Sequence, residues 1–124
     1  MPAHWRPLLP LFLLAGACKP APEAATELSL ASAERGKAAI ERVGCGSCHT
    51  IAGLSWPRGK TAPALTEGMA DRALIAGELE NRPDVLAAFV RDAPSLVPAT
   101  AMPAMPLSER EALDVAAYLY EIGG

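Results

Sequence analysis

The residues best suited to chemistry in this chain are two thiols and an imidazole in the run Cys45-Gly46-Ser47-Cys48-His49. Two thiols three residues apart can each add to one vinyl group of the same porphyrin, and the imidazole that follows can reach the iron from one face. This spacing is the pattern for attachment of a c-type haem. It predicts one covalent haem c, held by Cys45 and Cys48, with His49 as an iron ligand.

Two other readings of the same run are a redox dithiol and half of a zinc site. A thioredoxin-like dithiol follows a strand and precedes a helix, whereas here a helical pattern leads into Cys45 and a Gly- and Pro-rich stretch follows His49. A structural zinc site needs four ligands. The other Cys and His, Cys18 and His4, lie in or beside an apolar N-terminal segment. Haem attachment is therefore the favoured interpretation.

The chain beyond this motif resembles the small class I c-type cytochromes of the bacterial periplasm. The resemblance covers about residues 32–123, and its C-terminal part reads Thr100-Ala101-Met102-Pro103, Leu107-Ser108 and Val115-Ala116-Ala117-Tyr118-Leu119-Tyr120. It implies an all-α fold, the class I cytochrome c fold, with several short helices around one covalent haem c. It also implies electron transfer by a protein that is not an enzyme.

The resemblance further implies a partner for the ligand histidine. Thr61-Ala62-Pro63-Ala64-Leu65 matches a family turn whose carbonyl accepts a hydrogen bond from that histidine. The Pro63 carbonyl is therefore expected to bond Nδ1 of His49, which fixes the tautomer and leaves Nε2 for the iron. The family usually has Gly-Pro in this turn, and Ala62 replaces the Gly.

Three more residues are candidate neighbours of the haem. Arg72 and Phe89 match a family arginine and a family aromatic beside the haem propionates, although the aromatic is commonly Trp. Arg72 is thus an expected cofactor-binding residue, with a solvated surface charge as the alternative. Trp56 could shield the haem edge or pack within its loop.

The second iron ligand is expected from a proline-rich stretch that contains Met102 and Met105. A thioether is a soft, neutral ligand, and ligation by His and Met raises the haem potential. In the family the ligand methionine directly precedes a proline, a few residues before the last helix. The resemblance assigns Met102 to the iron and an ordinary apolar position to Met105.

Apolar periodicity and cap residues predict helices over residues 32–44, 71–79, 83–91 and 108–122. Ser32 is the expected N-cap of the first helix, and Ser108 with Glu111 forms a capping box for the last. The resemblance implies that Gly36 lets the first helix approach Tyr118. Gly and Pro predict loops over residues 50–66 and 92–106, and no β-hairpin is predicted.

The 124 residues leave room for one domain of roughly 90 residues behind an N-terminal leader. Residues 1–17 carry Arg6, a short apolar run and small residues, which is the layout of a secretory signal peptide. Residues 18–31 form a Pro-, Ala- and Glu-rich linker, and residues 32–124 are the expected cytochrome c domain. The formal net charge of −3 and the scattered basic residues exclude a nucleic-acid-binding protein.

Cys18 directly follows the leader and resembles the lipid-modified cysteine of bacterial lipoproteins. The preceding Leu14-Ala15-Gly16-Ala17 departs from that pattern, because Ala15 stands where the family usually has Leu. Ala15-Gly16-Ala17 also suits ordinary signal peptidase, which would release a soluble protein. We expect a periplasmic protein anchored to a membrane through Cys18, with a soluble periplasmic protein as the alternative.

Ligation by both His49 and Met102 would leave the iron without a vacancy for a substrate. The predicted function is therefore one-electron transport between redox protein partners such as a membrane oxidase or dehydrogenase. A dedicated haem subunit of such a complex is an alternative that the sequence leaves open. A haem enzyme or gas sensor with a labile Met102 is a further alternative, although no second His or Arg is obviously placed to drive O–O cleavage.

Overall fold

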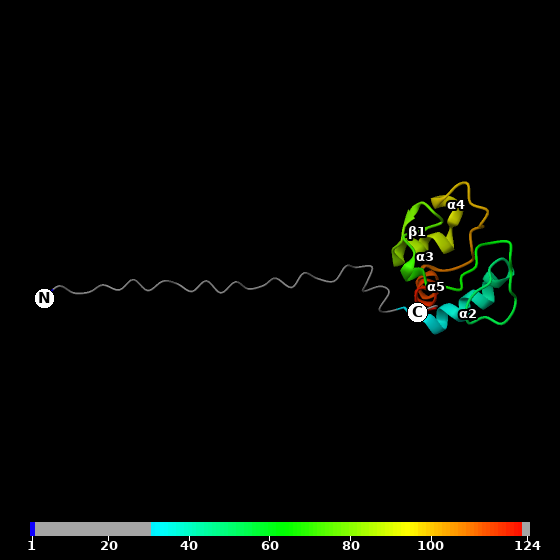
Figure 1. The fold of residues 1–124 in the computed structure, drawn as a ribbon, viewed down its shortest axis with the longest axis horizontal. Coiled ribbons are helices and arrows are strands. Elements are labelled where there is room, and N and C mark those ends of the chain that lie inside the picture. The colour runs from blue at the N-terminus through cyan, green and yellow to red at the C-terminus, as the bar shows by residue number, and fades with distance from the viewer. Residues whose placement is uncertain (2–30, 123–124) are drawn as a thin grey trace.

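The described part of the chain is mostly helical. The computed structural model describes Met1 and residues 31–122; residues 2–30, which include Cys18, and residues 123–124 lie outside this part. In chain order the elements are α2 (Ala33–Val43), the 3₁₀ turns η1 (Cys45–Ser47) and η2 (Met69–Asp71), strands β1 (Leu74–Ile75) and β2 (Leu79–Glu80), α3 (Pro83–Arg91), α4 (Ala93–Leu96) and α5 (Glu109–Glu121). Helix α5 packs against both α2 and α3 (Figure 1). Within the described ranges, no helix has the length and hydrophobicity needed to cross a membrane.

Helix α2 begins and ends where the sequence predicts. The Ser32 hydroxyl accepts a hydrogen bond from the amide of Arg35 at 3.2 Å, which satisfies one free amide of the first turn. Gly44 ends the helix in the left-handed conformation, with φ 81°, and its amide donates to the carbonyl of Ile40. The glycine turns the chain directly into Cys45, so the end of this helix positions the first thiol.

Helix α5 begins with the predicted capping box. The Ser108 hydroxyl accepts from the amide of Glu111 at 3.2 Å, and the Glu111 carboxylate accepts from the amide of Ser108 at 2.8 Å. The inner face of α5 buries Val115, Ala116 and Leu119 in the core that it shares with α2 and α3. Helix α3 has the predicted bounds, with a proline in its first turn.

Helices α2 and α5 lie in close contact at Gly36, and the atoms nearest to this glycine are not those of the predicted partner, Tyr118. A Cβ atom at Gly36 would overlap the carbonyl oxygen of Asp114 and crowd the amide of Val115. The backbone of α5 therefore requires glycine here, and not the ring of Tyr118, which lies one turn further along. The Tyr118 hydroxyl donates instead to the carbonyl of Ala52 at 2.7 Å.

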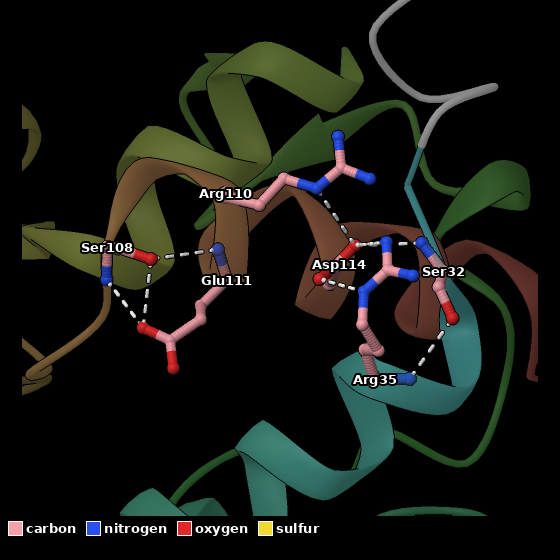
Figure 2. A network of polar contacts seen from close by, with 6 residues as sticks. All are labelled: Ser32, Arg35, Ser108, Arg110, Glu111 and Asp114. Carbon is pink, nitrogen blue, oxygen red and sulfur yellow. Dashed lines mark hydrogen bonds and ion pairs between the residues drawn. The ribbon is translucent and has the colours of Figure 1, made fainter.

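A buried carboxylate joins the same two helices (Figure 2). Asp114 is 3% exposed and accepts from the Ser32 amide at 2.8 Å and from Nε and Nη2 of Arg35, each at 2.9 Å. The Arg110 guanidinium lies 3.7 Å away. Burial alone would raise the pKa of Asp114, but the hydrogen bonds from Arg35 and Ser32 outweigh it and hold the pKa below its ordinary value. The first residue of the helical region is thereby tied to α5.

The predicted helix over residues 71–79 and the predicted absence of a β-hairpin are both wrong. A 3₁₀ turn ends at Asp71, and β1 then pairs with β2 in antiparallel register, Leu74 opposite Glu80 and Ile75 opposite Leu79. Positive φ angles at Ala76 (51°) and Gly77 (80°) form the tight turn between them. The short apolar run is compatible with the period of a helix and with that of a strand. The left-handed turn at Gly77 favours the hairpin.

The proline-rich stretch 92–106, predicted to be a loop throughout, contains one helical turn. Helix α4 covers Ala93–Leu96, with Pro94 in its first turn. Proline breaks a helix in its interior but fits its first turn, where the missing amide has no intrahelical partner. The remainder of the stretch is non-helical, as predicted.

Candidate functional site

The two thiols of the candidate site lie on one tight turn. The amides of Cys48 and His49 both donate to the carbonyl of Cys45, at 3.3 and 3.0 Å. Residues three apart eclipse each other on a 3₁₀ turn, so Cys45 and Cys48 project to the same side. Both are free thiols; Cys48 is exposed and Cys45 is half-buried. Burial raises the pKa of the Cys45 thiol, which keeps it protonated at neutral pH.

The imidazole of His49 is oriented by a backbone carbonyl. Its Nδ1 atom lies 2.6 Å from the carbonyl oxygen of Pro63. A carbonyl can only accept, so Nδ1 carries the proton and the neutral ring keeps the lone pair of Nε2 for a metal. Ala62, in the place of the family's glycine, does not prevent this hydrogen bond.

The turn that carries Pro63 is fixed on the segment that follows His49. The Ala62 amide donates to the carbonyl of Cys48 at 3.0 Å, and the Leu65 amide donates to the carbonyl of Thr50 at 2.7 Å. Residues 62–65 and 48–52 therefore form one hydrogen-bonded unit. The Pro63 carbonyl is held in place by backbone bonds on both of its sides.

The loop that carries Trp56 packs against the attachment turn, residues 45–49. The Gly59 amide donates to the carbonyl of Gly46 at 2.8 Å, and a Cβ at Gly46 would lie 2.8 Å from the carbonyl oxygen of Pro57. A Cβ at Gly59 would overlap the backbone between Ser47 and Cys48. Trp56, at the tip of this loop, is 82% exposed, so the alternative of a tryptophan packed within the loop is wrong.

Arg72 lies against the proximal turn, the turn of residues 62–65 that carries Pro63. Its Nη2 atom donates to the carbonyl of Ala64 at 3.2 Å, next to Pro63. The side-chain amide of Asn81 donates at 2.5 Å to the carbonyls of Met69 and Arg72, and its oxygen accepts from the hydroxyl of Tyr120 at 2.5 Å. Phe89, in α3, is a buried core residue.

The two candidate methionines are both half-buried and pack on the edge of the core. The Met105 amide donates to the carbonyl of Arg91 at the end of α3, at 2.9 Å, and thus fixes this part of the loop to the scaffold. The Met102 amide donates at 3.2 Å to the hydroxyl of Thr100, two residues away. Met102 is therefore positioned by its own turn, and Met105 by the helix behind it.

The donor set fits a porphyrin held through thioethers. Two thiols lie on one side of a turn, and the adjacent imidazole presents the nitrogen that coordinates a metal. Within residues 31–122, no three His, Cys, Asp or Glu side chains cluster so that they could hold a metal ion by themselves. Cys45, Cys48 and His49 would hold the haem, with Met102 as the candidate for its other face.

Three polar residues with buried or specific partners were missed by sequence reasoning. Asn81 was not among the predicted site residues, although all of its side-chain polar groups are engaged. Tyr120 and Asp114 were given no polar role either. A hydroxyl and a carboxylate within an otherwise apolar helix face were the available signals, because buried polar groups need partners.

Comparison with known proteins agrees with this geometry. The family model for Cytochrome c matches residues 33–122. Cytochrome c oxidase subunit 2 of Alkalihalophilus pseudofirmus is 38% identical over 88 residues, which cover 70% of this chain and 25% of that protein. The chain thus spans about a quarter of that relative's length. With its mostly helical architecture and its Cys-x-x-Cys-His turn, the chain belongs to the cytochrome c family, as a class I c-type cytochrome that transfers electrons through haem.

Proposed function

We propose that this protein is a one-electron carrier with one covalent haem c, attached at Cys45 and Cys48 and ligated by His49 and Met102. The observation that carries the proposal is the hydrogen bond of 2.6 Å between Nδ1 of His49 and the Pro63 carbonyl, which leaves Nε2 available beside the two thiols. A haem c bound there supplies a one-electron couple between ferrous and ferric iron. Arg72, close to the same turn, is the candidate partner for a propionate.

The matured, purified protein tests attachment and ligation separately. Acid–acetone extraction should leave the haem on the chain, and alkaline pyridine spectra should report one haem per chain. The reduced protein should be low-spin and should bind no carbon monoxide at neutral pH, because a thioether occupies the second axial position. Haem that washes out would refute covalent attachment. A Soret shift under carbon monoxide would favour an enzyme or gas sensor with a labile Met102.

A second candidate function is that of a fixed haem subunit in an oxidase complex. Its specific support is the 38% identity to a protein named cytochrome c oxidase subunit 2. Mild detergent extraction of membranes, followed by size separation, distinguishes the two functions. A free carrier should separate from larger complexes at moderate salt, whereas a fixed subunit should remain in one of them at constant stoichiometry.

We further propose that the mature chain is held on the outer face of a membrane by lipid on Cys18, with residues 19–30 as a tether. The support is the position of this cysteine directly after a leader-like segment in residues 1–17. Acylation with more than one chain would give stable anchoring. In detergent phase partitioning, wild type should enter the detergent phase and Cys18→Ser the aqueous phase. Wild type in the aqueous phase would indicate the soluble periplasmic form.

A further inference from the structure

The side chain of Asn81 has an unusually complete set of partners. Its Nδ2 donates at 2.5 Å to the carbonyls of Met69 and Arg72, and its Oδ1 accepts at 2.5 Å from the Tyr120 hydroxyl. An amide donates two hydrogen bonds from nitrogen, and two carbonyls can face only that nitrogen. The amide therefore has one possible orientation, and Tyr120 fixes it from α5.

The Tyr120 hydroxyl is well suited to this role. Burial, together with the negative charge of Asp84, raises the pKa of Tyr120, so the hydroxyl remains a donor throughout the neutral range. The carbonyl of Met69 also accepts from the Arg72 amide at 3.1 Å. Asn81 thus closes η2 and sets the position at which Arg72 leaves it.

From Arg72 the contacts lead to the candidate iron ligand. The Arg72 guanidinium donates to the carbonyl of Ala64 at 3.2 Å, and the adjacent Pro63 carbonyl accepts from Nδ1 of His49. On the opposite side, the Leu65 amide is bonded to the carbonyl of Thr50. The proximal turn is consequently held between the segment that carries the ligand and the side chain of Arg72.

We propose that Asn81 is a positioning residue for the His49–Pro63 hydrogen bond, acting through Arg72, with Tyr120 fixing its amide. The inference rests on the proposed function, in which His49 ligates the iron. A hydrogen bond to the outer nitrogen of a metal-bound imidazole strengthens the imidazole as a donor. A stronger donor stabilises ferric iron, so a looser Pro63 carbonyl should raise the reduction potential.

The mildest test is Tyr120→Phe in the full-length, haem-loaded protein, with Asn81→Ala as the stronger variant. The direct readout is the exchange rate of the His49 Nδ1 proton, observed by NMR of the reduced protein labelled with ¹⁵N-histidine. Both variants should exchange this proton faster, by about fivefold for the loss of one ordinary hydrogen bond. Both should also shift the potential upward.

Matched variants separate positioning from stability. Arg82→Gln alters the residue next to Asn81. Arg82 pairs with Glu80 at 3.3 Å and with Asp84 at 2.7 Å, and none of its hydrogen bonds reaches the proximal turn. It should leave proton exchange and potential at the wild-type values. Arg72→Lys keeps a donor for the Ala64 carbonyl. Its exchange rate for the His49 Nδ1 proton should therefore be closer to the wild-type rate than that of Arg72→Met.

Two results would overturn the proposal. Tyr120→Phe and Asn81→Ala could lower the melting temperature yet leave the exchange rate and potential unchanged, in which case Asn81 only stabilises the hairpin. Arg82→Gln could produce the same shifts, in which case they reflect general loosening. Failure of the proposed function is distinct from both, because wild type itself would then lack the low-spin spectrum of a histidine-ligated haem.

Discussion

At the scale of single residues, the main question in the site is which of the two methionines ligates the iron. Met105 is bonded through its backbone to the end of α3, whereas Met102 belongs to a local turn closed by Thr100. The side chain of a residue fixed to the scaffold is suited to filling space in the core. Met102 is the candidate ligand because the resemblance to the cytochrome c family assigns it to the iron.

Substitution of each methionine by alanine separates these roles. Met102→Ala should abolish the weak sulfur-to-iron absorption band of the oxidised protein and lower its reduction potential, because a thioether favours ferrous iron. Met105→Ala should leave both unchanged and lower the free energy of unfolding by about 2 kcal/mol, the lower limit for loss of a core methionine, because Met105 is only half-buried. Exchange of the two phenotypes would assign the ligand to Met105.

At the scale of elements, the packing of α2 against α5 is the main contact that stabilises the fold. Two features fix it: a glycine that admits the backbone of α5, and the buried carboxylate of Asp114. The same α2 ends at Gly44, which leads into the attachment turn. The position of the thiols therefore depends on how closely these helices pack.

Gly36→Ala tests the close approach. Alanine favours a helix by roughly 1 kcal/mol over glycine, but its Cβ would overlap the Asp114 carbonyl and force the helices apart. The net effect should be a loss of about 1–3 kcal/mol in the free energy of unfolding, as expected for overpacking. Ala38→Gly, on the exposed side of α2, is the control and should cost only the difference in propensity. A Gly36→Ala protein as stable as wild type in urea would contradict the close contact between Gly36 and the backbone of α5.

Asp114 makes the same crossing sensitive to acid. Its pKa is lower in the folded than in the unfolded chain, so its contribution to stability is complete above the ordinary carboxyl pKa of about 4 and is lost as the pH falls through the lowered value. Asp114→Asn should cost about 1–2 kcal/mol at neutral pH through weaker hydrogen bonds with the Arg35 guanidinium and the Ser32 amide. The difference from wild type should shrink below pH 4 in urea titrations. A difference that stayed constant with pH would show that the charge has no such role.

The elements that the sequence predicts well are those with local signals. The caps at Ser32, Gly44 and Ser108 act within one turn, and the Cys-x-x-Cys-His turn is itself a local pattern. The hairpin was missed because its strands have two residues each, too few for a period to show. Asn81 and Asp114 were missed because their partners are up to 82 residues away in sequence. The hydrogen bond of His49 to Pro63 was expected only through resemblance to a family.

At the scale of the whole molecule, charge is distributed unevenly around the site. The chain has a formal net charge of −3, yet residues 43–66 contain Arg58 and Lys60 and no acidic residue. Neither of the two forms an ion pair with another described residue, whereas five arginines of residues 31–122 do. They lie in the loop that packs on the attachment turn and exposes Trp56. The loop that packs on the attachment turn is therefore basic in an acidic protein.

This asymmetry predicts which small redox reagents react fastest. At about 0.1 M salt, charges more than about 10 Å from a site are largely screened, so the electric field at the site is set by the charges near it. At roughly 0.1 M salt, where this screening length holds, oxidation of the reduced protein by anionic hexacyanoferrate(III) should therefore accelerate as salt is lowered, despite the net negative charge. Oxidation by cationic tris(phenanthroline)cobalt(III) should slow. The double variant Arg58→Gln/Lys60→Gln should reduce the hexacyanoferrate rate at low salt by roughly tenfold.

Lys37 supplies the control for net charge, because it is a basic residue of α2 outside residues 43–66 and forms no ion pair with a described residue. Lys37→Gln changes the net charge by one unit and should leave the preference for the anionic reagent in place. Stopped-flow rates over a series of salt concentrations measure all three proteins under the same conditions. Equal effects per charge removed at Lys37 and at the Arg58–Lys60 pair would mean that net charge alone governs the rates. A larger effect at the pair would place the route of the electron beside the loop that carries Trp56.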